Sequence, residues 1–334
     1  MADIADGPLR RWYAGIMFSN EGQPHHRLRR LVGKAFTPQA VQTLRPVAAA
    51  LIAEQLAPLK AAGDGDLFAA LRHIPMYVMC DLLGVPKVAV PDFVAWVAAL
   101  SPTFGVMTSD EIEAATAAIT LLLDYVNAML EERNHAPGDD LISALLHAED
   151  DGDRLTRQET ADMVVNLLIG GYDTTASQTA CTLFTLLQRP ELFDDARADP
   201  ALIPLLVDET IRFEPAIGTA PRMAKAEFEV AGTVHPAGTV IFLATMTANR
   251  DPAVWADGDT FKARRFAKPD APKLLTFGGG AHFCLGTWLA RLVLEEVIRG
   301  VAELSPRLTV APETIEWVSP LGQNPARLPV SVKQ

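Results

Sequence analysis

The sequence has few cysteines, little positive charge and no long uninterrupted apolar run. Its three cysteines, Cys80, Cys181 and Cys284, are scattered along the chain, which excludes a disulfide framework and the paired spacing of a zinc site. No stretch reaches the roughly 18–20 apolar residues that span a bilayer. Residues 1–15 contain neither the apolar core nor the cleavage site of a signal peptide. We therefore expect a soluble cytoplasmic protein with no membrane partner.

Acidic residues exceed basic ones: the chain has 41 aspartates and glutamates and 29 lysines and arginines, which gives a net charge of −12. Nucleic-acid binding requires a basic face, so this balance argues against a nucleic-acid partner. The chain has 334 residues, 49% of them hydrophobic, and can bury a large core. It contains no internal repeat and no low-complexity linker. We therefore expect a single domain over residues 1–334.

Hydrophobic periodicity predicts a mainly α fold with a minor β region. Helices are expected over residues 22–62 in two stretches, 67–100 with breaks at prolines, 109–135, 156–188 and 201–213, and strands over 227–232 and 239–246. The longest of these helices begins with a T-x-x-E capping box, Thr156 and Glu159. At 1.5 Å per residue it would run about 48 Å, which is long enough to cross a domain.

A cysteine lies at the end of a glycine-rich loop, because residues 277–286 read FGGGAHFCLG and run into an apolar helical segment. We expect Cys284 at the first turn of that helix, where the helix dipole lowers a thiol pKa. The glycines remove side chains, so the backbone can approach a broad flat group. A thiolate in such a loop suits the iron of a haem. A small buried hydrophobe, the commoner state of a free cysteine, explains neither the glycines nor the flanking phenylalanines.

The pattern F-x-x-G-x-x-x-C-x-G resembles the haem-binding loop of the cytochromes P450. This sequence fills it with Phe277, Gly280, His282, Cys284 and Gly286. The resemblance implies haem b (iron protoporphyrin IX) as the cofactor, Cys284 as its iron ligand, and a triangular, helix-rich fold. It also implies that Phe277 and Gly278 lie against the cofactor.

The longest predicted helix contains Gly170, Gly171, Asp173 and Thr174 at its middle. Two interior glycines cost a helix about 2 kcal/mol relative to alanine. Alone, the pair favours a packing notch beside a solvated aspartate. Beside a haem thiolate it favours a locally opened helix, and the segment resembles the family's oxygen-activation motif. The resemblance implies Thr174 as a hydrogen-bond donor above the iron and Asp173 as the proton relay.

The two haem propionates require cations at a fixed depth. By resemblance, the ligands are His25, Arg29, Arg222 and His282. An ordinary basic helix face explains His25 and Arg29 equally well from spacing alone. His26 is a rival, and His25 is chosen for its H-x-x-x-R spacing.

Glu209 and Arg212 are spaced i, i+3, which alone is typical of a surface ion pair. They resemble the family's E-x-x-R, which implies a buried structural network with Arg265 behind the haem loop. Arg250 resembles another family segment and is expected to be a structural turn element.

The resemblance runs in order from Met17 onward. Family members place the H-x-x-x-R segment several dozen residues further along, so we expect a cytochrome P450 fold that lacks the usual N-terminal helices and strands. A strand edge would then be unpaired, and pocket surface would be open to water.

The resemblance implies a haem-thiolate monooxygenase that inserts one atom of O₂ into an apolar small molecule. Electrons would come from NAD(P)H through a ferredoxin reductase and a ferredoxin, docked on a local basic patch of a monomer. Candidate patch residues are Arg27, Arg30, Lys34 and Arg291, and candidate substrate contacts are Ile169, Gly170, residues 217–219 and residues 320–322. Two alternatives stay open: a peroxide-driven peroxygenase, and a truncated or mis-started chain that binds haem without catalysis.

Overall fold

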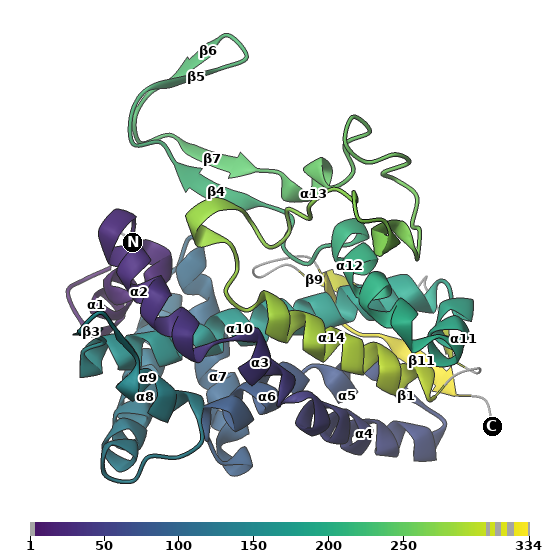
Figure 1. The fold of residues 1–334 in the computed structure, drawn as a ribbon, viewed down its shortest axis with the longest axis horizontal. Coiled ribbons are helices and arrows are strands. Elements are labelled where there is room, and N and C mark those ends of the chain that lie inside the picture. The colour runs from purple at the N-terminus through teal and green to yellow at the C-terminus, as the bar shows by residue number, and fades with distance from the viewer. Residues whose placement is uncertain (1–3, 305–307, 311–314, 319–323, 333–334) are drawn as a thin grey trace.

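The computed structural model describes residues 4–304, 308–310, 315–318 and 324–332, and helices make up most of it (Figure 1). The α-helices are α1 (Pro8–Gly15), α2 (Gly22–Ala35), α3 (Pro38–Gln42), α4 (Arg45–Ala62), α5 (Leu67–Leu71), α6 (Ile74–Leu83), α7 (Val90–Leu100), α8 (Ser109–His135), α9 (Leu141–His147), α10 (Arg157–Leu187), α11 (Glu191–Ala198), α12 (Ile203–Phe213), α13 (Thr245–Ala248) and α14 (Thr287–Ala302).

Short 3₁₀ helices and strands connect them. The 3₁₀ helices are η1 (Met17–Ser19), η2 (Lys87–Ala89), η3 (Ser101–Phe104), η4 (Pro200–Leu202), η5 (Arg265–Ala267) and η6 (Gly280–His282). The strands are β1 (Asp64–Asp66), β2 (Glu149–Asp150), β3 (Asp153–Arg154), β4 (Ala220–Met223), β5 (Phe228–Val230), β6 (Thr233–His235), β7 (Val240–Leu243), β8 (Leu308–Val310), β9 (Trp317–Val318), β10 (Asn324–Pro325) and β11 (Pro329–Val332). The predicted fold class, mainly α with a minor β region, is confirmed.

Helix α10 is the axis around which the core is built. The predicted capping box starts it, because the Thr156 hydroxyl accepts from the Glu159 N–H at 3.2 Å and the Glu159 carboxylate accepts from the Thr156 N–H at 2.8 Å. Helices α6, α8, α12 and α14 all pack against α10. Apolar side chains therefore surround it on several sides, which explains why its sequence lacks a single apolar stripe.

Helix α8 begins at a second capping box, Thr108 with Glu111, which the sequence analysis did not identify. It is long and apolar enough, by length and composition, to cross a membrane. In the structure it packs against α7, α9 and α10, with Ile119, Leu122 and Val126 fully buried. Core helices of soluble proteins pass the same test, so α8 is weak evidence for a membrane span.

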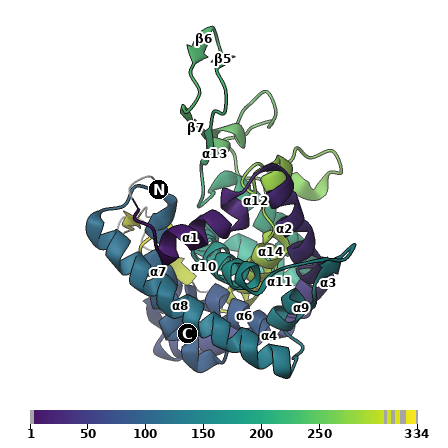
Figure 2. The same ribbon diagram turned by 90° about the vertical axis from the view of Figure 1, so that its left-hand side faces the viewer.

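The first helix also belongs to the core. Leu9, Trp12 and Ile16 are at most 1% exposed, and α1 packs on α8 and α10. Gly15 permits this approach, since a Cβ there would lie 2.7 Å from an oxygen of Asp162 on α10. Helix α1 thus lies against α8 and α10 (Figure 2).

The strands form small sheets. One has the order β1-β11-β8 and is antiparallel throughout, with Gly65 opposite Val330 and Ser331 opposite Thr309. The two-stranded sheets β4–β7 and β5–β6, with β5 and β6 between β4 and β7 in the chain, extend away from the helices (Figures 1 and 2). Among the described strands β4 and β7 pair only with each other, so each has a free edge. Met223 and Phe242 on this ribbon are 69% and 66% exposed, which makes it prone to association.

Candidate functional site

The cysteine loop is a turn that only glycine accommodates easily. Gly278 and Gly280 have φ angles of +75° and +70°, in the left-handed region that side chains rarely adopt. The Gly278 N–H donates to the Leu275 carbonyl at 2.8 Å, and the Cys284 N–H donates to the Phe277 carbonyl at 2.9 Å. The loop therefore closes on itself between Phe277 and Cys284, and the backbone of Cys284 is fixed.

The environment of Cys284 differs from the prediction in one respect. Helix α14 begins at Thr287, three residues later, so Cys284 precedes the helix and does not occupy its first turn. Burial by the surrounding protein raises the pKa of its thiol, and the Gly286 N–H, the Thr287 hydroxyl, Arg29 and Arg291 oppose that effect. The expected net lowering of the pKa is thus wrong for the free protein. The residue is nevertheless exposed at the surface.

The other two cysteines lie elsewhere. Cys80 on α6 and Cys181 on α10 are fully buried among apolar side chains. Burial raises the pKa of Cys80 to about 12 and also raises the pKa of Cys181. Neither thiol is accessible to a large group, whereas Cys284 is.

Helix α2 places a buried histidine next to the cysteine loop. His25 is 1% exposed, yet neither of its ring nitrogens has a hydrogen-bond partner among the described residues. Its ring lies 4.1 Å, between centroids, from that of His282 in the loop. His26 is exposed, so of the two candidates only His25 faces the loop. Buried polar atoms without a partner are rare and indicate that a polar group belongs there.

The remaining predicted cations are not gathered equally well. Arg29 is close enough for its charge to act on both His25 and Cys284, and it makes no ion pair within the described part of the chain. His282 lies 3.3 Å from Glu21, measured from Nε2 to Oε1. Arg222 is exposed on β4 and donates to the carbonyl of its neighbour Pro221 at 2.8 Å. The structure brings three of the four residues together around the loop, and within the described part of the chain no hydrogen bond or ion pair joins Arg222 to them.

Open space surrounds the glycines of the site. A Cβ added at Gly279 or Gly280 in the loop, or at Gly170 on α10, would meet no atom within 4 Å. Gly170 is exposed although it lies in the middle of a buried helix. A flat, anionic, iron-containing cofactor requires a ligand for its iron, cationic or donor groups for its acids, and room for its ring. Here these are a thiol, two unpartnered imidazole nitrogens with a free guanidinium, and glycines that face open space. The residues present therefore fit a haem.

The two glycines of α10 have different roles. A Cβ at Gly171 would lie 2.9 Å from the sulfur of Met79, so this glycine allows α6 to pack closely. Helix α10 is continuous through both glycines, and the Thr174 hydroxyl donates to the Gly170 carbonyl at 2.6 Å. The expected local opening of the helix is therefore wrong in this structure, because Thr174 bonds back within an intact turn.

Asp173, one residue before Thr174, is not the solvated aspartate of the simpler interpretation. Ser101 in η3 donates a close hydrogen bond to its carboxylate. Burial raises the pKa of Asp173 from 3.8 to about 6, while the nearby charge of Arg72 opposes the rise. A carboxyl with a pKa near 6 exchanges its proton close to neutral pH, which suits an acid–base group.

Behind the loop lies the predicted ion network, and it is confirmed. Glu209 and Arg212 on α12 are both 0% exposed and are joined by two hydrogen bonds of 2.8 Å. Arg265 donates to both carboxylate oxygens of Glu209 at 3.1 Å. Arg212 also donates to the backbone carbonyls of Asn249, Gly258 and Thr260. The pair is a buried cross-link that holds residues 249–265 against α12.

One residue that the sequence analysis missed connects this network to the cysteine loop. Asn249 is fully buried, and its carbonyl accepts from Arg212. Its side chain accepts from the Leu275 N–H at 3.0 Å and donates to the Thr276 hydroxyl at 2.8 Å, directly before Phe277. Its neighbour Arg250 was predicted to be a turn element, and its guanidinium carbon lies 4.5 Å from the centroid of the Phe213 ring. No local pattern in the sequence distinguishes Asn249 from an ordinary turn asparagine.

Comparison with known proteins decides the family. The cytochrome P450 family model matches residues 8–299, which is most of the chain. The chain belongs to the cytochrome P450 family. Haem is the cofactor of this family, and its members are oxidoreductases, so the chain is a cytochrome P450 enzyme.

Individual relatives agree with this assignment. The chain is 38% identical over 328 residues to nocardicin C N-oxygenase of Nocardia uniformis subsp. tsuyamanensis, covering 95% of this chain and 79% of that protein. It is 36% identical to mycinamicin IV hydroxylase/epoxidase of Micromonospora griseorubida, with 95% and 79% covered. The crystal structure of CalO2 matches with a TM-score of 0.91 and 28% identity, covering 99% of this chain and 83% of that one. The fold is thus the P450 fold.

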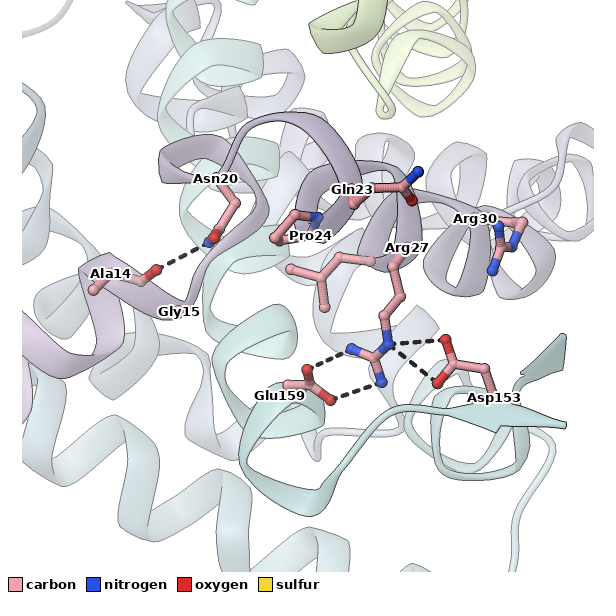
Figure 3. Close-up of a pocket in the computed structure, with 10 residues that line it drawn as sticks. Ala14, Gly15, Asn20, Gln23, Pro24, Arg27, Arg30, Asp153 and Glu159 are labelled. Atoms are coloured by element: carbon pink, nitrogen blue, oxygen red, sulfur yellow. Dashed lines mark hydrogen bonds and ion pairs between the residues drawn. The ribbon is translucent and has the colours of Figure 1, made fainter.

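The basic patch expected to bind an electron donor is neutralised within this P450. Figure 3 shows Arg27 held between Asp153, at 2.8 Å, and Glu159, at 2.5 Å, on one wall of an open groove between α1 and α2. Arg30 and Lys34 both pair with Asp150, and Arg291 pairs with Asp208 at 2.8 Å. These four cations therefore do not form the free basic surface that the sequence suggested.

The predicted substrate contacts are placed in part. Ile169 is buried on α10, next to the exposed Gly170, and residues 217–219 are half-buried or exposed after α12. A Cβ at Gly218 would lie 2.7 Å from the sulfur of Met246, so this segment packs closely on α13. Residues 320–322 lie outside the described residues.

Proposed function

We propose that this P450 is a haem-thiolate monooxygenase that inserts one atom of O₂ into an apolar small molecule and releases the other as water. The observation that carries the proposal is the grouping of the exposed Cys284 thiol with the unpartnered nitrogens of His25 and the charge of Arg29. The named activities of the relatives, an N-oxygenase and a hydroxylase/epoxidase, support the same class of reaction.

Each residue of this group has a proposed part in holding haem. Cys284 would bind the iron as a thiolate, and the loop from Phe277 and Gly278 onward would lie along the flat face. His25, Arg29 and His282 would bind propionates, with Arg222 reaching them from β4. The bound haem supplies the iron chemistry that activates O₂. The protein supplies position, charge balance and protons.

On α10, Asp173 and Thr174 are proposed to deliver and direct protons. Asp173 holds a proton near neutral pH, because burial raises its pKa to about 6. The Thr174 hydroxyl, now bonded to the Gly170 carbonyl at 2.6 Å, can rotate toward the open space beside Gly170 and donate there. A paired acid and hydroxyl serve an enzyme that must protonate reduced oxygen, whereas a peroxide-driven enzyme has no need of them.

We further propose that ferredoxin reductase and ferredoxin deliver the electrons from NAD(P)H. The enzyme is proposed to work as a cytoplasmic monomer with one domain over residues 1–334.

An apolar substrate is supported by the buried side chain of Ile169, which lies next to the open space at Gly170.

Replacing Thr174 by Val is expected to uncouple electron flow from product formation without stopping NADH consumption. Valine keeps the shape of threonine but removes the hydroxyl, so protons are delivered without direction and reducing equivalents leave as hydrogen peroxide. The measurement is product and hydrogen peroxide formed per NADH consumed, using an apolar compound that shifts the haem absorption band on binding.

Thr179→Val is the matched control. Thr179 lies on the same helix, is fully buried and bonds back to the Thr175 carbonyl at 2.8 Å in the same way. We expect it to leave the coupling unchanged. Equal coupling in wild type and Thr174→Val would remove the proposed role of Thr174.

A further inference from the structure

Ser101 contacts the acid of α10 from a different part of the chain. It is the first residue of η3, directly after α7, and it is 6% exposed. Its hydroxyl has two acceptors within reach: the Val97 carbonyl at 3.1 Å and the carboxylate of Asp173. A hydroxyl has only one proton to donate, so it cannot donate to both at the same time.

We propose that Ser101 is a positioning residue for Asp173, whose hydroxyl changes acceptor with the charge of that carboxyl. When Asp173 is ionised, Ser101 donates to it. When Asp173 is protonated, the acid O–H donates to the Ser101 oxygen, and the Ser101 proton turns to the Val97 carbonyl. This inference rests on the proposed function, in which Asp173 supplies protons.

The geometry allows both arrangements without movement of the backbone. The Val97 carbonyl already accepts the Ser101 N–H at the end of α7, and a carbonyl has two lone pairs, so it can accept the hydroxyl as well. In each charge state Asp173 therefore has one hydrogen bond to the same partner, with donor and acceptor exchanged. The carboxyl stays oriented while it gains and loses a proton.

Few other charges act at this position. Arg72, at the end of α5, favours the ionised form of Asp173. Tyr172 precedes Asp173 on α10. Its hydroxyl lies 2.9 Å from Nδ1 of His73, the residue before α6, and hydrogen-bonds to that nitrogen. Burial opposes ionisation, so both charge states of Asp173 are populated near neutral pH. Ser101 is the hydroxyl that contacts the carboxyl in both.

The test is the titration of Asp173 in the haem-loaded protein. The infrared carboxyl band that Asp173→Asn removes is followed against pH. Both charge states of Asp173 lose a hydrogen bond in Ser101→Ala, but the bond to the ionised carboxylate is the stronger one, so this variant is expected to raise the pKa of Asp173 by about one unit, a tenfold change in proton affinity. Ser101→Thr keeps the hydroxyl and is expected to restore the original value.

Thr103→Val is the matched control, because Thr103 is a buried hydroxyl of the same turn that donates to the Leu100 carbonyl at 2.6 Å. It is expected to leave the titration unchanged. An unmoved titration in Ser101→Ala would overturn the inference, and so would an equal shift in Thr103→Val. Full turnover in Asp173→Asn would instead overturn the proposed role of Asp173, and the titration distinguishes the two failures because it does not depend on activity.

Discussion

Replacing Asp173 by Asn is expected to lower the rate of product formation by about 10²–10⁴-fold, the usual effect of removing one acid–base group. The amide keeps the shape of the acid and can still accept the Ser101 hydrogen bond, but it cannot carry a proton at neutral pH. Haem content and substrate binding should stay as in wild type. The measurement is the NADH-driven rate at saturating substrate, together with the band shift that reports binding.

Asp162→Asn provides a closely matched control for this effect. Asp162 lies on the same helix and is 3% exposed, and burial raises its pKa to about 6 as well. It hydrogen-bonds Gln158 at 2.9 Å and faces α1, not the glycine pair. If both substitutions slowed turnover equally, a general effect of removing buried charge from α10 would explain the result, and the relay role of Asp173 would be lost.

Replacing Arg212 by Met is expected to destabilise the fold by about 3–5 kcal/mol, the usual effect of removing one partner of a buried ion pair. Glu209 would keep Arg265 but lose two hydrogen bonds, and the backbone carbonyls of Asn249 and Gly258 would lose the Arg212 donor, while the Thr260 carbonyl would keep Arg265 at 2.8 Å. Asn249 accepts from Arg212 and also from the Leu275 N–H, just before the cysteine loop. Loss of Arg212 should therefore loosen that loop, and the retention of haem should fall as well. The measurements are the denaturant midpoint and the haem content of the purified variant.

An exposed ion pair supplies the comparison. Arg154 is 63% exposed in its side chain and pairs with Glu149 on the surface. Arg154→Met is therefore expected to change stability by less than about 1 kcal/mol. A loss of similar size in the two variants would show that the Arg212 network contributes no more than a surface contact.

Local signals in the sequence were sufficient for much of the fold. Thr156 and Glu159 fix the start of α10, and the apolar period over residues 109–135 matches α8 from Ser109 to His135. The strands predicted over 227–232 and 239–246 contain β5 and β7, whereas their pairing partners β6 and β4 were not predicted. Each of these elements is determined by neighbours in the chain, which is why pattern and propensity identify it.

Contacts between distant segments could not be predicted in this way. Ser101 meets Asp173, and Arg27 meets Asp153 and Glu159, only after α2, α7 and α10 have packed together. The four expected docking cations appeared free in the sequence because their carboxylate partners lie far along the chain. Asn249 connects the ion network to the loop through its own backbone and side chain, and no spacing reveals that.

The thiol of Cys284 shows the same limit. A glycine-rich loop followed by a helix predicts a lowered pKa for the thiol, whereas in the fold Cys284 lies three residues before α14 and partial desolvation raises that pKa. Helix dipoles act mainly within the terminal turn, so burial outweighs the dipole at this distance. Iron binding, which deprotonates a coordinating thiol, would reverse the balance.

The central claim, haem bound through the thiolate of Cys284, is tested most directly by the absorption spectrum of the reduced, CO-bound protein. The account predicts the thiolate-type spectrum for the 334-residue chain, its loss in Cys284→Ala, and its retention in Cys80→Ala and Cys181→Ala, whose sulfurs are buried in the core. A thiolate-type spectrum that persists in Cys284→Ala, or a wild-type chain that takes up no haem, would contradict it.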